Sequence, residues 1–238
     1  MKGKKLLLII IPSAIVFMAG IVFLALWLSR GRPDYQGAAN YVGEILKHES
    51  IIEEYVNSNE NFGYDEIDRD ALGSFQNSVT SINSYYESLR ASTAQTNKEV
   101  AERYGEISPF IDKLSEVASV QNALVSYVDK VNTSGYASAN TELGALAASP
   151  NAFIITLGSN LSDYYKSLAE FEEKYQNGKA GNYNKMIEEY GNFVIAGEKL
   201  SAKYANVTFE EIFNISPTSV ANYFDQLRDF ESYLRAQQ

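Results

Sequence analysis

His48 is the only histidine among the 238 residues of this chain, and its side chain is the only one whose ordinary pKa lies near neutrality. It could act as a pH switch or as the base of a Ser-His-Asp triad, but no second histidine is present for a multi-histidine metal site. The absence of cysteine excludes disulfides, zinc ribbons, iron–sulfur clusters and thiol nucleophiles. Because His48 falls on an apolar helical stripe, we expect it at the edge of a core.

The run Asn57–Asp68 is a second candidate, because its oxygen-bearing side chains alternate as they do in calcium loops. In EF-hand register, however, Gly63 would be the seventh residue instead of the sixth. Asp68 also stands where a bidentate glutamate is needed. We therefore expect a polar surface loop here, and we predict no metal site and no cofactor.

Pairs of acidic residues could suggest catalytic carboxylates. Adjacent residues on a helix do not face each other, so these pairs are better interpreted as solvated helix faces. We therefore predict no catalytic residues and a protein that is not an enzyme. The pairs are Glu53-Glu54, Glu172-Glu173, Glu188-Glu189 and Glu210-Glu211.

Tyrosine is abundant, with 17 residues that include the pairs Tyr85-Tyr86 and Tyr164-Tyr165. On a helix the two rings of a pair lie about 100° apart, so one can join the core while the other lies beside it. Exposed tyrosines suit recognition surfaces, since they are large amphipathic groups with few torsions. Core rings with hydroxyls at the bundle edge are the alternative interpretation.

Residues 6–28 are uncharged and rich in Leu, Ile, Val and Phe. At about 1.5 Å per residue, a helix of this length spans roughly 35 Å and can cross a bilayer with some tilt. Three lysines precede the segment, at positions 2, 4 and 5, and Arg30 and Arg32 follow it. The excess of positive charge on the amino-terminal side predicts that residues 1–5 are cytoplasmic and that the rest of the chain is extracytoplasmic.

A cleaved signal peptide is the rival interpretation of this segment. Signal peptides have apolar cores of about 7–15 residues and small residues at the cleavage site. The core here is longer, and residues 28–33 offer no clear site of that kind. We therefore predict an uncleaved transmembrane anchor, with the lipid bilayer as a partner of residues 6–28.

Charge is divided unevenly along the chain. All 30 acidic residues lie after Pro33, together with 15 of the 20 basic ones, so residues 34–238 carry a net charge of −15. A surface this acidic repels phosphate backbones. We therefore predict no nucleic-acid partner.

Apolar residues recur at alternating steps of three and four after the anchor, which is the period of amphipathic helices. Ser108-Pro109 interrupts one series, either as a kink or as the start of a new helix. Thr208 and Glu211 fit a capping box, and Ser216-Pro217 fits a helix start. The six series run over Ala38–Tyr55, Leu72–Leu89, Val100–Val128, Ile154–Tyr175, Met186–Tyr204 and Val220–Leu234.

Six amphipathic helices with short links predict an all-α fold, in which a transmembrane helix precedes an up-and-down bundle over residues 34–238. The apolar faces are wider than the seam of a two-stranded coiled coil, so we expect a monomeric bundle.

Three hypotheses of function follow. The first is a single-pass membrane protein, expected in a bacterium, whose acidic extracytoplasmic bundle binds or scaffolds an envelope or surface protein. The second is a ligand-sensing bundle that acts through a partner protein, because the sequence has no second span and no output domain. The third, an envelope enzyme, has the least support. An exposed Tyr/Phe patch would favour the first hypothesis, and a ligand-sized pocket between helices the second.

Overall fold

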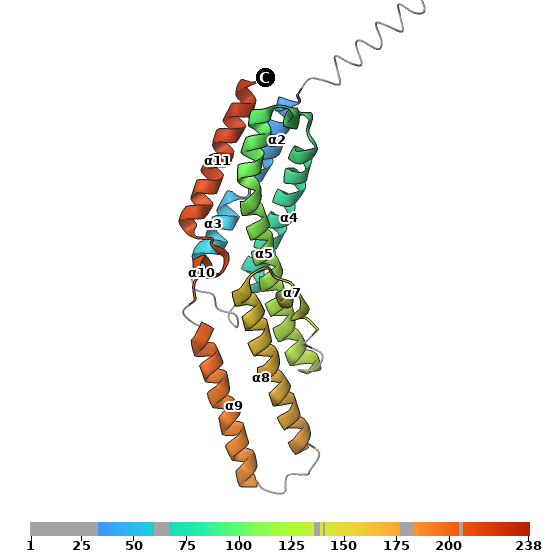
Figure 1. Cartoon of the computed structure of the whole chain (residues 1–238), viewed down its shortest axis with the longest axis vertical. Coiled ribbons are helices and arrows are strands. Elements are labelled where there is room, and N and C mark those ends of the chain that lie inside the picture. Colours follow the sequence, from blue (N-terminus) through green and yellow to red (C-terminus); the bar gives the residue numbers. More distant parts are fainter. Residues whose placement is uncertain (1–32, 60–66, 136–138, 140, 177–182, 205–206) are drawn as a thin grey trace, which may run out of the picture.

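The computed structural model describes residues 33–59, 67–135, 139, 141–176, 183–204 and 207–238 (Figure 1). The predicted all-α fold is confirmed in these ranges. Seven of their helices have ten residues or more: α2 (Tyr35–Leu46), α3 (Glu49–Ser58), α4 (Arg69–Ala91), α5 (Lys98–Ser134), α8 (Ala152–Gln176), α9 (Tyr183–Tyr204) and α11 (Pro217–Ala236). The shorter helices are η1 (Thr93–Thr96), α7 (Gly144–Ala147) and α10 (Phe209–Phe213).

The predicted transmembrane segment, residues 6–28, lies outside the described part of the chain. Within the described part, no helix is long and apolar enough to cross a membrane.

Side-chain caps fix where several helices begin. The Asp34 carboxylate accepts a hydrogen bond from the Gly37 backbone N–H at 2.8 Å and so starts α2. The carboxylate folds closely over Gly37, so a Cβ at this position would displace the Asp34 side chain. The capping box predicted at Thr208 and Glu211 is confirmed as the start of α10.

Helix α5 continues through Pro109, so no new helix starts at Ser108-Pro109. Its 37 residues correspond to about 55 Å at 1.5 Å per residue. The helix ends at Gly135, whose φ of 79° is a conformation that glycine adopts readily. Helix α4 lies along α5 from Tyr104 to Asp129. Helix α11 packs against the first part of α5, and α7 also packs against α5.

The half of the molecule that holds the carboxyl terminus is built from α2, α3, α4, α5 and α11 (Figure 1). Helix α11 packs against α2, α3 and α5, while α4 packs against the same three helices from another side. The series predicted over Leu72–Leu89 and Val220–Leu234 are confirmed, because all their apolar members are buried. These two faces and the buried side of α2 form one hydrophobic core.

The series Ala38–Tyr55 is divided between two helices. Helix α2 ends at Leu46 and α3 begins at Glu49, with His48 as its N-cap residue. The apolar spacing continues across this break. Of the predicted members, Ala38 and Ile45 are buried before it, and Ile52 and Tyr55 are buried after it. Tyr41 is half-buried, and Val42 beside it is buried in its place.

The second half of the molecule differs from the expected single bundle. Helices α8 and α9 form an antiparallel hairpin that extends away from the first half (Figure 1). Helix α8 packs against α7 and α9, and among the described elements α9 packs mainly against α8. On α8 the predicted series is buried at Ile154, Leu157 and Leu161, whereas on α9 only Tyr204 is buried.

Helix α8 offers a direct test of the buried series. Leu161 is 1% exposed, so Leu161→Ala should lower the free energy of unfolding by about 2–5 kcal/mol, through lost burial and the cavity left behind. Glu170 is exposed on the same helix, so Glu170→Ala should change it by less than about 0.5 kcal/mol. Urea melts of the chain in detergent measure both values. Equal and small effects would contradict a buried role for Leu161.

Candidate functional site

The α8–α9 hairpin is held together by aromatic side chains on its inner face. The Phe171 ring lies edge-on to that of Phe193, with 5.1 Å between centroids, and the Tyr190 ring is 6.2 Å from Phe171. The Tyr164 hydroxyl lies 3.5 Å from the Phe193 carbonyl oxygen, to which it donates. A Cβ on Gly197 would stand 2.7 Å from Tyr164 Oη, so the glycine lets the two helices approach.

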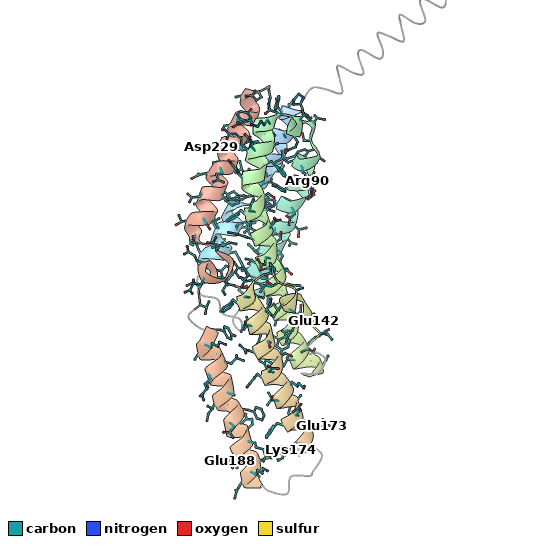
Figure 2. The ribbon with its side chains drawn as sticks, viewed as in Figure 1. Arg90, Glu142, Glu173, Lys174, Glu188 and Asp229 are labelled. Atoms are coloured by element: carbon teal, nitrogen blue, oxygen red, sulfur yellow. The ribbon has the colours of Figure 1, made fainter. Side chains whose placement is uncertain are left out.

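A polar clamp joins the two helices near the tip of the hairpin. Lys174 Nζ lies 2.7 Å from both carboxylate oxygens of Glu189, and the Tyr175 hydroxyl donates to Glu189 at 2.8 Å. Hydrogen bonds from Lys174 and then Tyr175 hold the pKa of Glu189 below its ordinary value. Figure 2 shows Lys174 and Glu188 at the end of the molecule far from Asp229 and Arg90. Because the clamp is exposed, it sets the register of the hairpin more than its stability.

An apolar stripe runs along one flank of α9 beside this inner face. Its members are Tyr183, Ile187, Tyr190 and Val194, with exposed fractions of 68%, 51%, 57% and 43%. The steps between them are four, three and four residues, so at 100° per residue they lie within a strip about 60° wide. We call these four residues the α9 stripe. Ile195, next to Val194, is 50% exposed.

The exposure of the α9 stripe follows from the small number of helices that pack against α9. Helix α5 ends at Ser134. The ring of Tyr127 on α5 packs against the ring of Tyr165 on α8, with 5.3 Å between their centroids. The part of the hairpin beyond Tyr165 is thus a pair of helices, whereas each long helix of the first half has several neighbours. A helix with two apolar flanks and one main neighbour leaves one flank in water.

A groove of about 480 Å³ lies on the opposite side of the hairpin. Its walls combine the rings of Tyr164 and Phe193 with Asp163 on α8 and with Lys199 and Lys203 on α9. Burial, followed by the nearby Tyr190, raises the pKa of the Tyr164 hydroxyl, so this group stays protonated and can donate. The volume suits a small ligand, and the charged groups could orient one.

His48 belongs to no catalytic constellation among the described residues. It is half-buried, and its side chain makes no capping hydrogen bond. Burial lowers the pKa of His48, while the neighbouring Glu44 opposes that shift and Lys47 adds to it. These surroundings agree with the expected position at the edge of a core.

The described ends of the run Asn57–Asp68 have structural roles. Asp68 accepts hydrogen bonds from the backbone N–H groups of Asp70 and Ala71 and so caps α4. Asn59 donates to the Tyr55 carbonyl oxygen at 2.8 Å. Residues 60–66 lie outside the described part, and within that part no group of three or more His, Cys, Asp or Glu could hold a metal ion.

The acidic pairs do not form a common site among the described residues. Glu211 closes the capping box of α10, and Glu189 takes part in the hairpin clamp. Glu172 and Glu210 are exposed. Glu54 and Glu188 are exposed as well, and Glu53 is half-buried.

The tyrosine pairs follow the core interpretation in part. Tyr86 is buried, stacks on Tyr104 at 4.3 Å and donates its hydroxyl to the Tyr104 carbonyl oxygen at 2.9 Å, while Tyr85 is half-buried. Tyr164 and Tyr165 are both half-buried, with 4.9 Å between ring centroids.

Among the described residues, the exposed tyrosines lie outside those pairs, at Tyr183 and Tyr190. Residue spacing places Tyr190 in the predicted series Met186–Tyr204 and does not single out Ile187 or Val194. The sequence does contain the spacing of this stripe, because α9 carries a second apolar series at helical steps beside the first. Spacing alone cannot tell whether a second neighbouring helix covers that stripe.

Comparison with protein-family models, with curated proteins and with solved structures found no match to this chain. The class of the protein is therefore described from its fold and its site alone. It is an elongated all-helical protein with an apolar stripe on the hairpin at one end of the molecule (Figure 1).

The exposure of the α9 stripe predicts that it contributes little to folding. Ile187→Ser and Val194→Ser hold helix propensity nearly constant, so each should change the free energy of unfolding by less than about 0.5 kcal/mol. Urea melts of the dilute full chain in detergent test this. A loss as large as that expected for Leu161→Ala would mean that the stripe is packed inside the protein.

Proposed function

We propose that this chain is a single-pass membrane protein of the cell envelope whose extracytoplasmic helical part binds or scaffolds a partner protein without catalysis. Residues 6–28 anchor it in the lipid bilayer, residues 1–5 are cytoplasmic, and the α9 stripe is the binding face. The observation that carries this proposal is the exposure of four large apolar side chains in one line on α9.

The arrangement of the chain ends supports the role of the hairpin. Pro33, Asp34 and Tyr35 line one hollow together with Gln237 and Gln238, so the segment that follows the anchor meets the carboxyl terminus at one end of the molecule. The α8–α9 hairpin forms the other end (Figure 1). An anchored chain would therefore carry the α9 stripe on its membrane-distal half, where a partner could reach it.

The chemistry of the α9 stripe also favours protein binding. Two of its four members are tyrosines, and the other two are β-branched aliphatic residues that lose little side-chain entropy when they are covered. Aromatic residues at the centre of an apolar patch are typical anchors of protein interfaces. The acidic surface elsewhere, with −15 over residues 34–238, disfavours nucleic acid and anionic lipid as partners of this half.

A ligand-sensing bundle that acts through a partner protein is the second candidate. The groove of about 480 Å³ between α8 and α9 favours it, because its size fits a small molecule. A ligand there would contact Tyr164 and Phe193, which also hold the two helices together. Binding could thus change the packing of the hairpin and the neighbouring α9 stripe.

Position-specific photo-crosslinking in intact spheroplasts of the native cell tests the first candidate. A photoreactive phenylalanine analogue at position 187 or 194 should form a discrete protein adduct, because both side chains project from the α9 stripe. The same analogue at position 192, about 170° around the helix from the centre of the stripe, is the matched control. Adducts of equal yield from all three positions, or from none, would contradict a binding role for the α9 stripe.

A further inference from the structure

We propose that the partner of the α9 stripe is the same stripe of a second copy of this chain. The two α9 helices would lie parallel, with a two-fold axis along the length of the molecule. This inference rests on the proposed function, because it requires both copies to be anchored in one membrane through residues 6–28.

The residue types of the α9 stripe fit a parallel pair of helices. Steps of four, three and four place Tyr183 and Tyr190 at the d positions of a heptad and Ile187 and Val194 at the a positions. β-branched residues at a favour two-stranded parallel pairing when leucine occupies d. The a positions here meet that pattern, and tyrosines take the place of leucine at d. Across a two-fold axis each residue then meets its own copy, so Ile187 faces Ile187 and Val194 faces Val194.

The charges of α9 also fit a second copy. Residues 183–204 contain three lysines and three glutamates, so α9 is neutral within a region whose net charge is −15. The lysines, at positions 185, 199 and 203, lie about 150° or more around the helix from the stripe. Asn184 and Gly191, which border the stripe, are uncharged. Two acidic copies can therefore meet here with little repulsion, whereas a charged partner finds no opposite charge along the stripe.

Membrane anchoring supplies both the orientation and the concentration that such a pair needs. Two chains inserted in one membrane with the same topology point the same way, which is the parallel arrangement. The α9 stripe spans twelve residues, or about 17 Å of helix from first to last, so its interface is smaller than the standard 1,600 Å² or so of stable complexes. Pairing is accordingly weak in dilute solution and depends on the high effective concentration of two tethered copies.

The absence of cysteine makes this pairing directly measurable, because any thiol introduced into the full chain is the only one present. Ile187→Cys and Val194→Cys are made separately in the full chain, and native membranes are treated with a mild oxidant. Each variant should form a covalent dimer, since paired a positions bring their Cα atoms within the roughly 4.4–6.8 Å that a disulfide requires. Both residues are exposed in the single chain, so neither substitution threatens folding.

Asn192→Cys is the matched control, because it lies on the same helix at the same height but on the opposite side. Its yield of dimer should be several-fold lower. Equal yields from Ile187→Cys and Asn192→Cys would overturn the proposal. Dimers that form only when Ile187→Cys and Tyr190→Cys chains are mixed would indicate an antiparallel pair, in which a positions face d positions, and would overturn the parallel arrangement.

The two proposals fail in different ways. A photo-adduct from position 187 with the mass of another protein, without cysteine dimers, would refute self-association and leave the binding role intact. The loss of both the adducts and the dimers would refute both.

Discussion

Helix α5 runs without a break from Lys98 to Ser134, and both halves of the molecule are built on it. Its first part closes the core formed with α2, α4 and α11, and its later part supports α7 and the start of α8. The buried side of the helix shifts along its length: Ile107, Ile111 and Leu114 give way to Leu124 and Tyr127, which turn toward the second half. The unbroken run of α5 therefore links the two halves of the molecule.

The exposure of α9 follows from its having one main neighbour among the described elements, helix α8. The contacts of the hairpin include the packing of Phe171 against Phe193 and Tyr190, and the Lys174–Glu189 clamp. These contacts use one face of α9 and leave most of the α9 stripe in water. The feature that carries the proposed function is thus produced by the same geometry that builds the fold.

Residue spacing was sufficient to predict much of the fold. It gave the buried faces of α4 and α11 residue by residue, because each of these helices has neighbours that cover its whole apolar side. It could not predict the break between α2 and α3 at Lys47–His48, because the spacing of apolar residues continues unchanged across it. It also could not separate the two flanks of α9, since an apolar stripe looks the same in a sequence whether or not a helix covers it.

Amide hydrogen exchange of the dilute full chain in detergent is the most direct test of the claim that α9 has one neighbour and a free apolar flank. Helices α4 and α11 open only with the core, so their amides should exchange slowest. The amides of residues 187–195 should exchange much faster despite their helical structure, because α9 can detach without opening the core. Protection of α9 equal to that of α11 would mean that its stripe is buried within the chain, and would contradict this account.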